Sequence, residues 1–112
     1  MIYEIIFTMP RRTPPTHPAQ RRQLAALGQR LRAARLRRRL TQALLAERVG
    51  VSVPTIRKLE GGNASTSLSV VMRALVVLGL SADIDRIAAE DSLGRELQDA
   101  ALKNPRHPRG AP

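Results

Sequence analysis

Three hydroxyl residues and three glycines alternate through the middle of the sequence and divide it into short segments. The hydroxyl residues are Thr41, Ser52 and Ser67, and the glycines are Gly50, Gly61 and Gly79. A Ser or Thr before a helix caps it by accepting a hydrogen bond from an amide of the first turn. A glycine ends a helix because it adopts the left-handed conformation at little cost. The alternation therefore predicts three short helices, at residues 41–49, 53–60 and 68–78.

Apolar residues at helical spacing extend this pattern in both directions. A first helix is predicted from Pro18 to Arg39, because one apolar stripe recurs there every three or four residues. Its members are Leu24, Leu27, Leu31 and Ala34. A short amphipathic helix is predicted near the end of the chain, with Leu93, Leu97, Ala100 and Ala101 on one face. The fold class that follows is all-α, a compact bundle of four to five helices.

Residues 81–89 fit two structures. Ala82 and Ile84 alternate with aspartates, as in a half-exposed strand, whereas Ile84 and Ile87 are three positions apart, as in a helix. One short C-terminal strand is therefore an alternative to a helix in this segment.

Proline content and charge divide the chain into four parts. Residues 1–18 are expected to form a flexible extension rich in Pro and Arg, and residues 103–112 a disordered tail. Residues 19–80 contain the predicted helices of the main domain. Residues 81–102 form a separate C-terminal segment.

The apolar start of the chain has no obvious place in a helical domain. Either Met9 is the true first residue, or the segment from Ile2 to Phe7 forms a small strand. It carries Glu4 and no basic region, so it does not resemble a secretory signal. No run approaches the roughly 18–20 apolar residues of a membrane span. We expect a cytoplasmic protein.

The charge balance is strongly basic and uneven along the chain. The 112 residues include 19 Lys and Arg against 9 Asp and Glu, which gives a formal net charge of +10. Residues 1–40 hold 10 basic residues and 1 acidic residue, whereas residues 81–112 hold 5 basic and 6 acidic residues. This balance favours nucleic acid as a partner over an anionic membrane surface.

Composition argues against several other kinds of site. The absence of Cys excludes disulfides, zinc–thiolate sites and thiol nucleophiles. The only His residues, His17 and His107, each stand beside a proline and form no cluster in the sequence. After Phe7 the chain has no aromatic ring on which RNA bases could stack. The acids of the C-terminal part, Asp83, Asp85, Glu90 and Asp91, have neither metal spacing nor a nucleophile beside them. We expect no enzyme, no metal and no cofactor.

Two short helices joined by a tight glycine turn are typical of a helix-turn-helix motif. The first helix of such a motif crosses the DNA phosphates while the second lies in the major groove. Helix N-termini present unpaired amides to phosphate oxygens, and Thr41–Gln42 and Ser52 supply two of them. Ile56 and Leu59 define the buried side of the second helix.

The residues around this motif follow a specific order. They read Leu27-Gly28-Gln29-Arg30-Leu31-Arg32 … Arg35 … Leu40-Thr41-Gln42 … Leu45-Ala46 … Val49-Gly50-Val51-Ser52 … Thr55-Ile56 … Leu59-Glu60-Gly61-Gly62 … Ser67-Leu68 … Leu75 … Leu78-Gly79. This order resembles the XRE, or Cro/repressor-type, helix-turn-helix family over about residues 24–80. Within the family the chain most resembles the HipB-type antitoxins. That likeness rests on four helices followed by a possible strand from Ser81, and on the run Leu93-Gly94-Arg95-Glu96-Leu97-Gln98-Asp99.

The resemblance implies a function. Members of the XRE family are repressor-like helical bundles that bind operator DNA as homodimers and repress transcription. A HipB-type antitoxin also sequesters a HipA-like kinase toxin. A rival is a toxin-sequestering protein–protein inhibitor with secondary DNA binding. A stand-alone XRE-family regulator and a non-specific DNA- or RNA-packaging protein are further alternatives.

The resemblance also implies which residues contact DNA. Gln42 matches a phosphate-contacting Gln, and Thr55 matches a backbone contact. Base-reading positions fall on Val53, Pro54, Arg57 and Lys58, which we expect on the side of their helix opposite Ile56 and Leu59. Val53 and Pro54 have no hydrogen-bonding side chain, so base readout would rest on Arg57, Lys58 and DNA shape.

A structural ion pair is expected between Arg35 and Glu60. The resemblance implies it, and Glu60, four residues after Ile56, tilts inward and needs a cationic partner. The run Arg37–Arg39 is expected to be a solvated cluster near phosphate, with base reading as the alternative. Ser65 and Thr66 either bind phosphate or serve the loop alone.

The C-terminal segment carries apolar residues of its own. Ile84 and Ile87 form one set, and Leu93 and Leu97 belong to another. A helix as short as the predicted one is marginal alone and needs a packing partner. We therefore expect residues 81–102 to form the dimer and to hold any protein partner.

Overall fold

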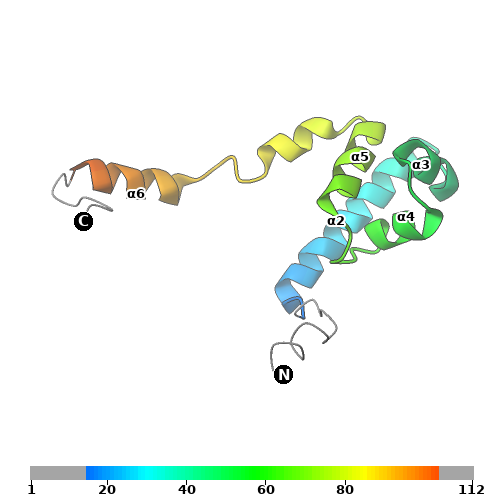
Figure 1. Ribbon diagram of the computed structural model, residues 1–112, viewed down its shortest axis with the longest axis horizontal. Coiled ribbons are helices and arrows are strands. Elements are labelled where there is room, and N and C mark those ends of the chain that lie inside the picture. Colours follow the sequence, from blue (N-terminus) through cyan, green and yellow to red (C-terminus); the bar gives the residue numbers. More distant parts are fainter. Residues whose placement is uncertain (1–14, 104–112) are drawn as a thin grey trace, which may run out of the picture.

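The computed structural model describes residues 15–103, and every regular element in this range is a helix (Figure 1). The elements are α2 (Pro18–Arg37), α3 (Gln42–Val49), α4 (Val53–Glu60), α5 (Leu68–Leu78), the 3-10 helix η1 (Ser81–Arg86) and α6 (Ser92–Lys103). The all-α prediction is confirmed for these residues. The expectations for the start of the chain, for an early strand and for the tail beyond Lys103 lie outside the described residues.

Each of the three short helices has a hydroxyl residue as its N-cap. The Oγ1 atom of Thr41 accepts a hydrogen bond from the Leu44 amide at 3.0 Å. Ser52 and Ser67 cap α4 and α5 in the same way. Gly50 and Gly79 end α3 and α5 with φ values of 85° and 75°. After α4 the left-handed residue is Gly62 rather than Gly61, because α4 runs on through a tight turn.

The alternative of a strand at residues 81–89 is wrong. Residues 81–86 form η1, and the half-buried Ile84 packs against the core. The backbone groups of this segment are satisfied locally, since the amide of Asp83 donates to the carbonyl of Leu80 at 3.0 Å and the amide of Ile87 to that of Ile84 at 3.3 Å. The amide of Leu80 also donates to the carbonyl of Leu75 at 2.7 Å, which turns the chain back toward α5.

A single apolar core joins α2, α3, α4 and α5. Its buried members are Leu31, Ala34, Leu45, Ala46, Val49, Ile56, Leu59, Val70, Ala74, Leu75 and Leu78. Leu45, Ile56 and Leu78 are its largest fully buried side chains. Ile84 of η1 lies at its edge.

Two glycines allow α2 to cross the end of α4 at close range. A Cβ atom on Gly28 would collide with the carbonyl oxygen of Glu60 and lie 2.8 Å from the Gly62 nitrogen. A Cβ atom on Gly62 would lie 2.6 Å from the carbonyl oxygen of Leu24. No larger residue fits at either position without moving backbone, so these glycines set the distance between α2 and α4.

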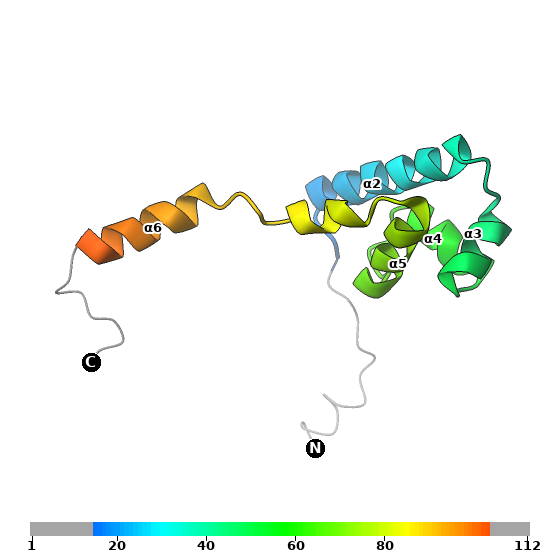
Figure 2. The same ribbon diagram turned by 90° about the horizontal axis from the view of Figure 1, so that it is seen from above.

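Helix α6 projects from the rest of the molecule, as two perpendicular views show (Figures 1 and 2). None of its residues is buried, and its side chains Leu93 and Leu97 are 65% and 63% exposed. It is therefore an amphipathic helix whose apolar face has no partner among residues 15–103. None of the helices in this range combines the length and apolar content that a membrane span requires.

Candidate nucleic-acid interface

The turn between α3 and α4 is short and held by backbone hydrogen bonds. Only three residues separate the helices, and the amides of Gly50 and Val51 both donate to the Ala46 carbonyl, at 2.8 and 3.0 Å. Val51 is half-buried and packs against the core. The turn therefore fixes the angle at which α4 leaves α3. Both helices lie at the end of the molecule opposite α6 (Figure 2).

A buried ion pair ties α2 to the end of α4. The guanidinium of Arg35 donates from Nε to Oε2 of Glu60 at 2.6 Å and from Nη2 to Oε1 at 3.1 Å. The two side chains are 7% and 3% exposed. Two parallel bonds between a planar guanidinium and a carboxylate fix direction as well as distance. The arrangement locks the orientation of α4 relative to α2.

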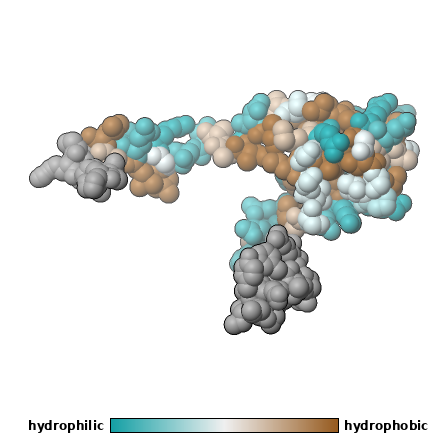
Figure 3. Space-filling model, in the orientation of Figure 1, coloured by the Kyte–Doolittle hydropathy of each residue, from teal (hydrophilic) through white to brown (hydrophobic). Residues whose placement is uncertain are grey.

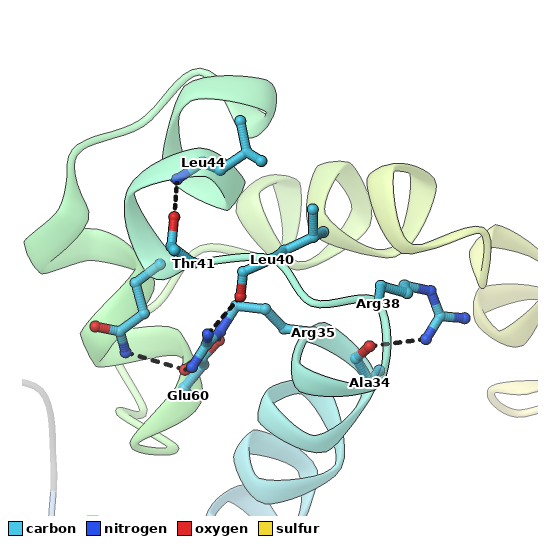
Figure 4. A network of polar contacts seen from close by, with 8 residues as sticks. Ala34, Arg35, Arg38, Leu40, Thr41, Leu44 and Glu60 are labelled. Carbon is cyan, nitrogen blue, oxygen red and sulfur yellow. Dashed lines mark hydrogen bonds and ion pairs between the residues drawn. The ribbon is translucent and has the colours of Figure 1, made fainter.

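The same pair is connected to the start of α3 (Figure 4). Nη1 of Arg35 donates to the carbonyl of Leu40 at 2.8 Å, just before the Thr41 cap. Nε2 of Gln42 donates to Oε1 of Glu60 at 3.0 Å. We call Arg35, Leu40, Gln42 and Glu60 the anchor network. It places both helices of the motif against α2.

The sequence did not reveal the bond from Gln42 to Glu60. The resemblance assigned Gln42 to phosphate, and its half-buried side chain still has a carbonyl oxygen and a second N–H for other contacts. Glu60 was expected to tilt inward, and a buried carboxylate has about four lone-pair sites, more than the guanidinium of Arg35 fills. A further hydrogen-bond donor to Glu60 could therefore have been expected.

Helix α4 presents a polar side to solvent. Pro54, Arg57 and Lys58 are exposed, while Ile56, Leu59 and Glu60 are buried. Both cations are free of ion pairs among the described residues. A helix with its side chains is about 10–12 Å in diameter, and the DNA major groove is about 12 Å wide, so α4 is able to enter it.

Val53 does not lie on that side. It is half-buried and packs against the core, so the expectation that it faces away from Ile56 and Leu59 is wrong. The physical reason is helical periodicity, because Val53 precedes Ile56 by three positions and shares its face. Of the two apolar residues at the start of α4, only Pro54 is exposed.

Basic side chains gather where α2 ends. Arg37, Arg38 and Arg39 are all exposed. Nη1 of Arg38 donates to the Ala34 carbonyl at 2.8 Å, which caps the last turn of α2. Arg39 has a φ of 56°, in the left-handed region, and so reverses the chain toward α3. The cluster is solvated, as expected, and one of its members serves the helix end.

The loop before α5 gives different surroundings to its two hydroxyl residues. The amide and the hydroxyl of Ser65 both donate to Oδ1 of Asn63, at 2.8 and 2.6 Å. Oγ1 of Thr66 is buried and has no hydrogen-bond partner among the described residues. A buried oxygen is in no position to meet a phosphate, so Thr66 belongs to the loop packing.

Arg73 is a residue of this region that the sequence reasoning missed. It lies on α5, and its Nη1 donates to the carbonyl of Val49 at 3.3 Å, at the last residue of α3. It therefore helps to hold the turn between α3 and α4. The available signal was its position as the one charged residue in an otherwise apolar or small helix, Leu68–Leu78.

The acids of the C-terminal segment form no metal-binding group. Asp83 makes an exposed contact with Arg86 at 3.4 Å. Between residues 15 and 103, no three His, Asp or Glu side chains are grouped closely enough to hold a metal ion.

Two capped helices at a fixed angle, with a basic exposed side on the second, define a helix-turn-helix DNA-binding domain. A family model described as a helix-turn-helix domain matches residues 26–87, which is more than half of the chain. The chain belongs to this family, which is part of the XRE-like helix-turn-helix group. No curated protein and no solved structure matches it.

Proposed function

We propose that this protein is a sequence-specific transcriptional repressor that binds operator DNA as a homodimer in the cytoplasm. The observation that carries the proposal is the exposed side of α4, where Arg57 and Lys58 project from a helix held by the anchor network. The second helix of the motif is the element that reads base edges in helix-turn-helix proteins. The formal net charge of +10 adds attraction to phosphate.

The proposed DNA contacts divide into two kinds. Arg57 and Lys58 read base edges, where a bidentate bond to guanine is the commonest contact of such side chains. Pro54 is exposed and presents its ring to a thymine methyl group at a base edge. The remaining residues contact phosphate or sugar and set the position of the domain: Thr41, Gln42, Ser52 and Thr55. Val53 supports the start of α4 from the core side, since it is half-buried.

Binding to a defined sequence tests the proposal directly. The full chain is titrated into a labelled duplex from the region upstream of its own gene, and into a scrambled duplex of equal composition. A specific repressor is expected to prefer its operator by about 10³-fold or more. Equal affinity for the two duplexes would contradict specific repression and favour a packaging role.

The antitoxin role is a second proposal. It is supported by the resemblance of the segment Leu93–Asp99 to HipB-type antitoxins and by the exposure of that segment. The test is co-expression with a HipA-like kinase encoded beside the gene. A stable complex in which kinase activity falls supports the role. An active kinase that does not bind the chain leaves a stand-alone regulator of the XRE family.

A further inference from the structure

An apolar groove of about 700 Å³ lies between α2, α5 and η1. Its lining includes Leu27, Leu31, Leu68, Val71, Ile84 and Ile87. Leu68 and Ile87 are 61% and 68% exposed, so the groove leaves large apolar side chains in contact with water. The space-filling view shows apolar surface on α6 and also on the part of the body from which the chain leaves toward it (Figure 3). Contiguous apolar surface of this kind marks an interaction site.

The same chain carries a helix with the complementary property. Leu93, Leu97 and Ala100 follow one another at helical spacing and share one face of α6. That face is exposed, and a helix of 12 residues is marginal in water without packing. Among residues 15–103 nothing apolar fills the groove, and the apolar face of α6 has no surface to pack against.

We infer that the groove of one chain binds α6 of a second copy, so that two chains exchange their C-terminal helices. The direction of the chain supports exchange over folding back. The connection Ile87–Asp91 leaves η1 with an extended residue, Ile87 at φ −68° and ψ 126°. It carries α6 away from its own groove in both views (Figures 1 and 2). Exchange of an identical element is a route to a two-fold dimer that costs little free energy.

The dimensions of the two parts agree. The groove is lined along α2 from Leu24 to Arg37, a helical length of about 20 Å. Helix α6 has 12 residues and is about 18 Å long. Two-fold symmetry forms the contact twice, which doubles the buried area toward the 1,200–2,000 Å² or so of a specific interface.

Charges at the edges of the two surfaces are also complementary. Arg30 and Arg37 border the groove on α2 and are exposed. Glu96 and Asp99 lie on α6, and Glu96 borders its apolar face, since it follows Leu93 by three positions. None of these four side chains forms an ion pair among the described residues. Asp83 also lines the groove, and Lys103 follows Asp99 by four positions on α6. The pairing is favoured in the orientation that brings Glu96 and Asp99 to Arg30 and Arg37 and Lys103 toward Asp83.

The first test measures the dimer dissociation constant of the full chain by analytical ultracentrifugation. Leu97→Asp alters the helix and Leu68→Asp alters the groove. Each is expected to raise the dissociation constant by at least about 30-fold, as the loss of a central interface residue does. Leu102→Asp and Val76→Asp are the matched controls. Leu102 is exposed on α6 and Val76 is exposed on α5, and both side chains lie outside the proposed contact. The controls are expected to dimerise like the unmodified chain.

The inference rests on the proposed homodimer, and the outcomes separate the two. A Leu68→Asp variant that dimerises like the unmodified chain overturns the groove as the binding site and leaves the homodimer standing. A full chain that stays monomeric overturns both. Neither readout involves DNA, so DNA recognition is tested independently.

Disulfide trapping then identifies which copy fills the groove. The chain has no Cys, so introduced residues have no competitors. Leu97→Cys is combined with Leu68→Cys or with Ile87→Cys, which lie on different sides of the groove and cover both helix directions. Exchange predicts a covalent dimer on oxidation of one of the double variants, and little from any single variant. A disulfide within one chain, or efficient crosslinking of Leu97→Cys alone, would overturn the inference.

Discussion

Glu60 is the residue on which the orientation of the motif depends. Its carboxylate accepts two hydrogen bonds from Arg35 and one from Gln42, and its side chain is 3% exposed. A charge so deeply buried is tolerated only because its partners are in place. Removing one member of the pair leaves the other as an uncompensated charge.

Replacing Glu60 with Ala is therefore expected to destabilise the fold severely. Breaking a buried pair from one side costs about 3–5 kcal/mol. Urea denaturation followed by circular dichroism measures the free energy of unfolding. Asp83→Asn is the control, because the contact of Asp83 with Arg86 is exposed, and exposed pairs contribute about 0–1 kcal/mol. Equal stability of the Glu60 variant and the unmodified chain would show that the anchor network has no structural role.

Arg57 and Lys58 are single residues that are expected to affect DNA binding and not stability. Each replaced by Ala is expected to weaken operator binding by about 1–3 kcal/mol while the melting temperature stays unchanged, because both side chains are exposed. Fluorescence anisotropy with operator and scrambled duplexes gives both affinity and preference. Arg95→Ala removes an equal charge from α6, away from α4, and should change little. Unaltered affinity and preference in either variant would remove that residue from the reading surface.

At the scale of the element, the ends of the helices were predictable because their causes are local. The Thr41 and Ser52 oxygens accept bonds from amides three residues later, so the sequence itself contains both partners. The Arg35–Glu60 pair was also within reach, since a buried acid on a short helix needs a cation. Its geometry and the third partner, Gln42, depend on how three helices meet, which local sequence does not specify.

The parts of the structure that were not predicted correctly are those whose conformation depends on contacts with residues distant in the sequence. Residues 81–86 form a 3-10 helix because Ile84 reaches the core, and alternation alone does not encode that contact. Val53 was expected on the exposed side both from the family pattern and from the buried side defined by Ile56 and Leu59, but its three-position spacing from Ile56 places it against the core. The projection of α6 depends on the course of the chain after Ile87, for which the sequence carries no clear signal.

The close crossing of α2 and α4 gives a prediction about packing. Gly28→Ala places a methyl group against the backbone of Glu60 and forces the two helices apart. Overpacking of this kind costs about 1–3 kcal/mol, although Ala is the better helix former. Gln29→Ala is the matched control, since Gln29 is exposed on the same helix. Thermal melts of the two variants compare them, and a Gly28 variant as stable as the control would mean that the helices separate without cost.

At the scale of the whole molecule, dimerisation is expected to determine affinity for a palindromic site. Two linked domains gain affinity because the second contact forms at high effective concentration. Leu97→Asp should therefore bind a single half-site like the unmodified chain, yet lose most of its preference for the full palindrome over the half-site. Titrations with both duplexes at fixed salt measure the two quantities, because binding through phosphates depends strongly on salt.

One result of these titrations would contradict dimerisation through α6. If the Leu97→Asp variant kept the full preference for the palindrome, the two domains would be joined through another surface. Leu102→Asp serves again as the control, since it alters the other side of α6.

The Arg35–Glu60 pair also has a consequence for how the molecule opens. Its two members are 25 positions apart, and the segment between them contains all of α3 and the turn. While the pair holds, that segment is a closed loop whose ends are not able to separate, and we expect α3 and α4 to lose their backbone protection together. Their amides would then exchange hydrogen with solvent through one cooperative event, with a free energy near that of global unfolding. A DNA-reading surface of this kind meets its target already ordered, and association carries little entropic cost of folding.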